Sequence, residues 1–159
     1  MTTPFLAARS ARLALLLMML ISMPLHALES GQQKIVDGLA VYLGILPAEM
    51  LLGHQVDSAG REMHGGVPPG NYRYHVVVAL FDAKTGVRIS NAQVRARVTE
   101  SGRAGPRKKL EPMLMQGSVT YGDYFILPTP GPYKVEIEIV QPGATTPTAV
   151  VFEYRFGRA

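Results

Sequence analysis

Apolar and polar residues alternate over nearly the whole of two segments of the chain, 92–100 and 133–140. In both, an apolar side chain occupies every second position and Arg, Lys, Glu or another polar residue lies between. A period of two is typical of a β-strand with one buried and one solvated face. Less regular apolar runs predict further strands at 39–46, 72–81, 124–127 and 149–156, and a short, proline-interrupted strand near 110–115.

Turn signals rich in Gly and Pro separate these segments about every ten residues, and no sustained helical period follows residue 30. The fold class predicted is therefore all-β, an immunoglobulin-like antiparallel β-sandwich of about seven strands. A small closed barrel is the alternative.

Two stretches interrupt the strand pattern. Residues 47–71 are expected to form one long loop, and a loop of that length in a compact domain is usually functional or disordered. The basic stretch RAGPRKK, 103–109, is expected to be a solvated hairpin loop. Contact of that stretch with an anionic partner or a lipid headgroup is the alternative interpretation.

The N-terminus has the pattern of a Sec-type signal peptide. Arg9 and Arg12 precede an apolar run from Leu13 to Met23, and a small residue, Ala27, stands at a plausible cleavage point. We therefore expect a signal peptide at 1–27, a periplasmic location and one sandwich domain at 28–159. An uncleaved N-terminal anchor is the alternative.

Composition narrows the function. Loss of the two signal-peptide arginines lowers the formal net charge from +4 to +2, which argues against a nucleic-acid partner. The chain has no cysteine, so disulfides, thiolate metal sites and cysteine nucleophiles are excluded. No hydrolase, phosphate-binding or metalloprotease motif occurs in the sequence, and we expect a protein that is not an enzyme.

Methionine and histidine offer the most specific chemistry, because thioether and imidazole together suit copper. Met113 and Met115 are two residues apart and would share one face of a strand, opposite an apolar face of Leu110, Pro112 and Leu114. Met63 and His64 are neighbours in a Gly-flanked stretch, with Glu62 before them and His54 ten residues earlier. Core packing is the alternative role for both methionines of 110–115. His75 is expected to be structural, on the face of its strand opposite the core.

Four stretches resemble the periplasmic immunoglobulin-like proteins associated with high-affinity ferrous iron uptake. They are GLAVYLGILPAEM (38–50), EMHGG (62–66), YRYHVVVALFDAKTG (72–86) and PMLMQGSVTYGDYFILPTPGPYKVEIEIVQPG (112–143). The resemblance implies an often dimeric sandwich, hence a homodimer, that holds copper and handles iron at a site of His and Met with a nearby acid.

The resemblance also implies individual site residues. Met113, eight residues before Tyr121, stands at the family's methionine ligand, and His64 stands near its early histidine. Thr120 occupies the place of a second histidine, and Gly66 that of the glutamate that follows the early histidine. The family's late histidine has no counterpart, because no histidine follows His75.

Together these observations predict an exported, non-catalytic protein that binds or handles a copper or iron ion, accessory to a membrane metal transporter or another periplasmic protein. The ligands predicted are His64, Met113 and Met115, with Met63, His54 and Glu62 as further candidates. The Tyr121 hydroxyl is expected to orient one of them. The alternative function is an immunoglobulin-like interaction module of a periplasmic or membrane-associated complex, without metal, that uses the 47–71 loop.

Overall fold

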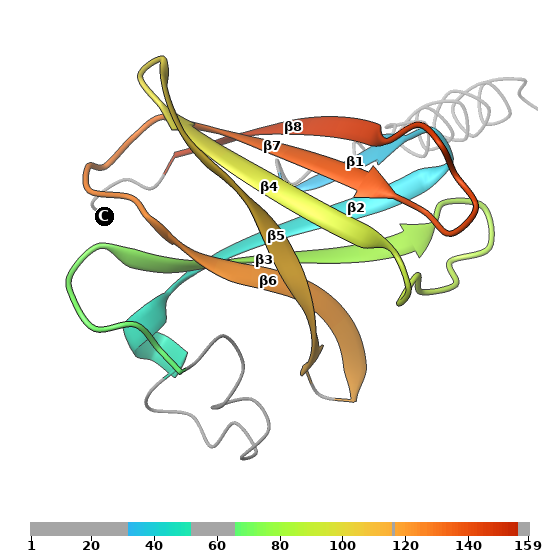
Figure 1. Cartoon of the computed structure of the whole chain (residues 1–159), viewed down its shortest axis with the longest axis horizontal. Coiled ribbons are helices and arrows are strands. Elements are labelled where there is room, and N and C mark those ends of the chain that lie inside the picture. Colours follow the sequence, from blue (N-terminus) through green and yellow to red (C-terminus); the bar gives the residue numbers. More distant parts are fainter. Residues whose placement is uncertain (1–31, 52–65, 116, 156–159) are drawn as a thin grey trace, which may run out of the picture.

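The computed structural model describes residues 32–51, 66–115 and 117–155, and it contains eight antiparallel strands (Figure 1). The strands are β1 (Gln33–Val36), β2 (Leu39–Pro47), β3 (Arg73–Asp82), β4 (Gln93–Glu100), β5 (Arg103–Met115), β6 (Ser118–Ile126), β7 (Tyr133–Val140) and β8 (Thr148–Tyr154), with a short 3-10 helix, η2 (Ala48–Leu51), after β2. None of the described segments forms a helix long and apolar enough to cross a membrane.

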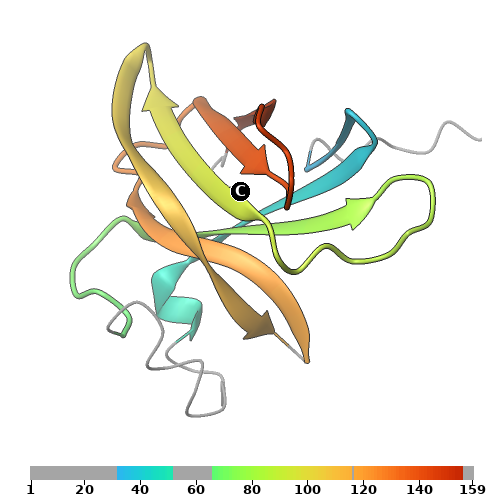
Figure 2. The same ribbon diagram turned by 45° about the vertical axis from the view of Figure 1, so that its right-hand side comes forward.

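Strand β5 joins the two layers of the fold. Its first half pairs with β4, as at Val94 and Leu110, and its second half pairs with β6, as at Met113 and Thr120. One layer, sheet A, therefore contains β1, β2, β3, β6 and the end of β5, and the other, sheet B, contains β4, β7, β8 and the start of β5. The layers cross, as Figures 1 and 2 show. The fold is thus the immunoglobulin-like antiparallel sandwich that the sequence predicts.

The two outermost strands approach each other and nearly close the sheet. Strands β1 and β8 stand at the two ends of the strand order β1-β2-β3-β6-β5-β4-β7-β8. The Lys34 ammonium of β1 lies 5.8 Å from the ring centroid of Phe152 in β8. This approach protects the two edges that an open sandwich would expose to other chains.

The core lies between the layers and follows the predicted alternation. In β3 the even positions face inward, and Val76, Val78 and Leu80 are fully buried. The inward positions of the segments predicted at 92–100 and 133–140 are buried too: Val94, Ala96, Val98, Tyr133, Val135, Ile137 and Ile139. The inward faces predicted for these strands are therefore confirmed.

The prediction for 103–109 is wrong, because these residues form the first half of β5 and pair with β4. The β4–β5 turn needs only Ser101 and Gly102, which take positive φ angles of 44° and 82°. Residue Gly105 is confined by the strand pairing, since a β-carbon there would lie 2.8 Å from the Val98 carbonyl oxygen.

Other boundaries differ less. Strand β1 was not predicted, and β6 begins at Ser118 rather than at 124, because a tight turn with Gly117 at a φ of 75° replaces the expected Gly-rich turn. Of the loop predicted at 47–71, residues 48–51 form η2, and 52–65 lie outside the described residues. The predicted signal peptide at 1–27 lies outside them as well.

Tyr121 ties the β3–β4 connection to sheet A. Its ring is 1% exposed in the core, its hydroxyl accepts a hydrogen bond from the Ala92 amide at 2.9 Å, and it donates one to the Ile89 carbonyl at 3.3 Å. Burial raises the pKa of the Tyr121 phenol, and the hydrogen bond from Ala92 opposes that rise. The expectation that this hydroxyl orients a ligand beside Met113 is wrong, because it is engaged on the inner side of the sheet.

We expect Tyr121→Phe to lower the free energy of unfolding by about 1–3 kcal/mol, because the Ala92 amide and the Ile89 carbonyl lose a buried partner. Urea unfolding followed by circular dichroism measures the change. Tyr72→Phe is the matched control, since the Tyr72 side chain is 58% exposed. An unchanged midpoint in the Tyr121 variant would contradict this role.

Candidate metal centre

Three neighbouring strands bring a histidine and a methionine to the outer face of sheet A. Gly122 of the central strand β6 pairs with Val77 of β3 on one side and with Glu111 of β5 on the other. His75 lies two residues from Val77, and Met113 lies two residues from Glu111. Because side chains two apart in a strand share a face, His75 and Met113 approach Gly122 from opposite sides.

Gly122 leaves the space in which these two side chains meet. A β-carbon at this position would clash with Met113 Cε, lie 2.7 Å from His75 Nε2 and lie 3.1 Å from the Val76 carbonyl oxygen. The imidazole nitrogen and the thioether methyl therefore converge over the Gly122 backbone. Any larger residue would separate or displace them.

The site is buried although it faces away from the core. His75 is 4% exposed, Met113 is 6% exposed, and the neighbouring Thr120 is 8% exposed. In such a setting a metal ion would be held by protein groups with little competition from water.

An aromatic side chain supports the imidazole. The rings of His75 and Tyr124 have centroids 4.8 Å apart and planes tilted by 32°. Burial raises the pKa of the Tyr124 phenol, and the adjacent Asp123 carboxylate raises it further. Lys108 holds this part of β6 in place, because its ammonium donates to the Tyr124 carbonyl at 2.6 Å and lies 3.3 Å from the Asp123 carboxylate.

Two oxygen-bearing side chains share the face. Thr120 stands directly opposite Met113 across β5 and β6, and its buried hydroxyl has no hydrogen-bond partner within the described part of the chain. Glu111, two residues before Met113, is partly exposed, and its carboxylate is paired with the Lys109 ammonium at 3.1 Å.

The sequence correctly predicted which residues of this strand share a face. It did not predict which of them are buried. Met113 and Met115 do share a face opposite Leu110, Pro112 and Leu114, as expected. Of that supposed apolar face, however, Leu110 is buried and Leu114 is 56% exposed. Met115 pairs with Ser118 at the end of β5 and is half-buried.

The other predicted ligands, His54, Glu62, Met63 and His64, lie outside the described residues. Within the ranges the structure describes, no group of three or more His, Asp or Glu side chains is arranged to hold a metal ion. Sequence reasoning missed His75 as a candidate, although it placed that residue on the correct face. The signal available was its odd position in a strand whose even positions form the core.

Comparison with known proteins identifies the fold. No protein-family model matches the chain, and no curated protein matches it either. Among solved structures, a copper-bound point variant of FetP from uropathogenic Escherichia coli strain F11 superposes with a TM-score of 0.60 at 17% identity, over 80% of this chain and 95% of FetP.

Two further structures agree. FetP from the same strain, as isolated, has a TM-score of 0.61 at 17% identity over 79% of this chain and 93% of its own. A DUF4426 family protein from Pseudomonas aeruginosa PAO1 has a TM-score of 0.59 at 13% identity over 80% of this chain and 96% of its own. At these identities the likeness concerns the fold.

Proposed function

We propose that this chain is an exported, non-catalytic copper-handling protein and that His75 and Met113 are copper ligands. The observation that carries the proposal is the convergence of the His75 imidazole and the Met113 side chain over Gly122 in a buried site. The shared fold with copper-bound FetP supports it. We also propose that the protein acts as an accessory to a membrane metal transporter.

The donor types favour copper over ferrous iron. A thioether is a soft ligand that prefers Cu(I), and an imidazole binds copper in either oxidation state. Ferrous iron would rely on harder donors, of which Glu111 is the carboxylate nearest along the strand. Met115 and the predicted residues His54, Glu62, Met63 and His64 remain candidates to complete the coordination.

When bound, copper would supply the one-electron Cu(I)/Cu(II) redox couple. The residues around the site would govern access to the ion. The Tyr124 ring packs against the His75 imidazole, and Gly122 leaves the space in which that imidazole and the Met113 side chain meet. The function proposed is therefore holding and transfer of the ion rather than turnover of a substrate.

We expect His75→Ala and Met113→Ala each to weaken Cu(I) binding by about tenfold or more, the scale seen when residues that support metal sites are changed. Competition with a chromophoric Cu(I) chelator measures the affinity. Met50→Ala is the matched methionine control, because Met50 lies in η2 and is 50% exposed. Unchanged affinity in both site variants would refute the assignment of the ligands. Failure of the native protein to take up copper would refute the function and favour the interaction module.

We also expect Gly122→Ala to reduce Cu(I) affinity, because its methyl group would occupy the space where His75 Nε2 and the Met113 side-chain methyl meet. Gly44→Ala is the control on the same sheet face, since a β-carbon there would make only ordinary contacts at 3.9 Å with Val77. Thermal unfolding monitors the fold of both variants. Equal copper affinity in the two folded proteins would contradict the proposed geometry.

A third change should strengthen the site. Thr120→His would place a second imidazole directly opposite Met113 on the same face. The Thr120 hydroxyl that it replaces forms no hydrogen bond with the residues that the structure describes. We expect Cu(I) affinity to rise by about tenfold. The same chelator competition tests this, with Ser118→His, beside Met115 at the strand end, as the comparison. A larger gain in the Ser118 variant would place the metal nearer Met115 than Met113.

A further inference from the structure

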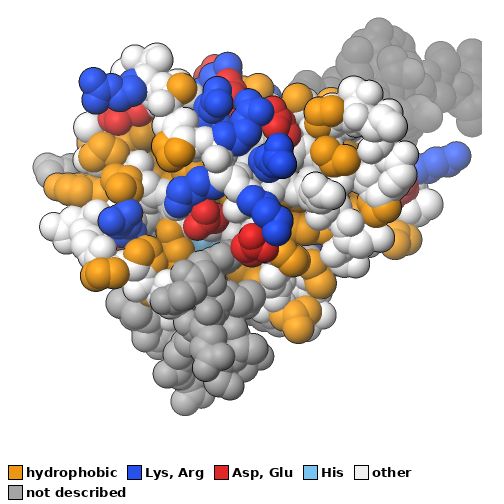
Figure 3. Space-filling model, viewed as in Figure 1, with side chains coloured by type: hydrophobic (Ala, Val, Ile, Leu, Met, Phe, Trp, Pro, Cys, Tyr) orange, Lys and Arg blue, Asp and Glu red, His pale blue; other side chains and the backbone are white. Residues whose placement is uncertain are grey.

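The outer face of sheet B carries a block of four positive charges. Across β4 and β5, Arg95 stands directly opposite Lys109, and Arg97 stands directly opposite Arg107. Lys and Arg side chains gather over these two strands in Figure 3. Like charges at directly opposed positions of a sheet repel each other, so the balance depends on the carboxylates that the other neighbouring strand, β7, supplies.

Acidic neighbours on β7 neutralise this block only in part. Glu138 is paired with Arg107 at 2.6 Å, and Glu136 is paired with Lys134 at 2.8 Å. The hydrogen bond from Lys134 lowers the pKa of Glu136, and the positive charges of Lys134, Arg97 and Arg107 lower it further.

Arg95 and Arg97 also stand directly opposite Glu138 and Glu136 of β7, but these two carboxylates are engaged by Arg107 and Lys134. Arg95 and Arg97 form no salt bridge with any residue that the structure describes. The Arg97 Nε is in addition buried without a hydrogen-bond partner there. A guanidinium group that forms no salt bridge can pair with a new anionic partner, because its fork of donors matches a carboxylate.

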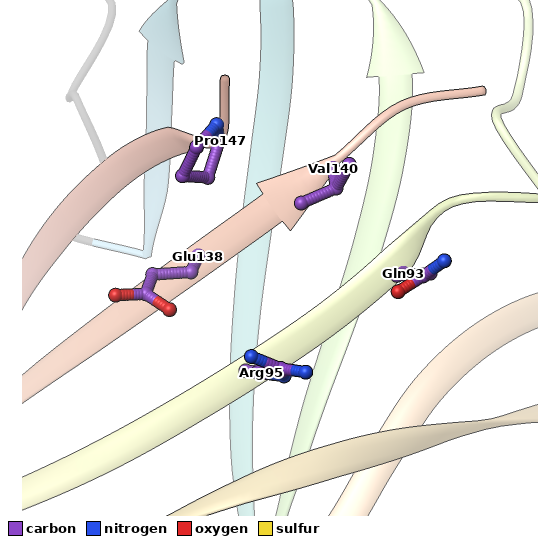
Figure 4. Close-up of a pocket in the computed structure, with 5 residues that line it drawn as sticks. All are labelled: Gln93, Arg95, Glu138, Val140 and Pro147. Carbon is purple, nitrogen blue, oxygen red and sulfur yellow. The ribbon is translucent and has the colours of Figure 1, made fainter. Parts of the chain in front are cut away.

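A shallow hollow lies at one end of the block. Gln93 and Arg95 of β4, Glu138 and Val140 of β7, and Pro147 before β8 line it (Figure 4). The amide of Gln93 and the apolar surfaces of Val140 and Pro147 extend the surface beyond the arginines. The hollow could therefore seat a side chain adjacent to one that pairs with Arg95.

We propose that the outer face of β4 and β5 is a docking surface for an acidic segment of a partner protein, whose carboxylates pair with Arg95 and Arg97. Charge complementarity on a local scale favours a protein segment over a membrane. Glu136, Glu138 and Glu153 face the same side from β7 and β8. A uniformly negative lipid surface would meet these carboxylates together with the arginines, whereas a peptide can lie along β4 and β5 alone.

The test uses a fluorescent hexaglutamate peptide and measures its binding to the full chain by anisotropy. We expect binding that weakens with added salt, and an affinity lower by about fivefold in Arg95→Ser/Arg97→Ser. Lys84→Ser/Arg73→Ser is the control, because it removes the same net charge from β3 and the connection after it. Thermal unfolding of both double variants checks that each remains folded.

Three results would overturn the proposal. They are absence of hexaglutamate binding by the native chain, equal losses in the two double variants, and binding to phosphatidylglycerol vesicles but not to the peptide. The vesicle result would assign the arginines to a lipid surface instead. Copper affinity is measured on the same variants, and an unchanged value shows that this surface is independent of the metal site on sheet A.

Discussion

The structure depends on the transfer of one strand, β5, between two pairing partners. Up to Leu110 the strand bonds to β4, and from Glu111 onward it bonds to β6. This transfer connects the two layers and also positions the chemistry. The outward side chains of β5 belong to the charged face of sheet B at Arg107 and Lys109, and to the methionine face of sheet A at Glu111 and Met113.

The fold could be predicted largely because burial imposes a period of two on the sequence. The strands predicted at 92–100 and 133–140 were correct because the inward side chains of these segments fill the core and most of the outward ones are charged or polar. The prediction of a loop at 103–109 was wrong because this strand lacks that alternation. Lys108, two residues before the buried Leu110 and on the same face, is charged and pairs with Asp123 at 3.3 Å, so no apolar alternation marks the strand. Gly105 and Pro106 add turn signals that the sheet pairing overrides.

Of the candidate metal site, the sequence alone predicted one of the two residues, Met113. The sequence indicated Met113 and the face on which it lies, because parity along one strand is a local property. The proximity of His75 is not local, since it requires the strand order β3-β6-β5 and the register of two separate pairings. A single sequence shows which face a residue occupies, but not which strand comes to lie beside it. Gly122, which reads as a turn residue, is informative only once those neighbours are known.

The depth of the site has a kinetic consequence. Because only 4% of His75 and 6% of Met113 is exposed, a chelator or a partner's ligand would reach an ion at the proposed site only after local opening of the structure. Exchange would then be limited by the frequency of that opening rather than by bond strength alone. An ion could in this way be held for long periods by few donors and released quickly when a recipient protein stabilises the open state.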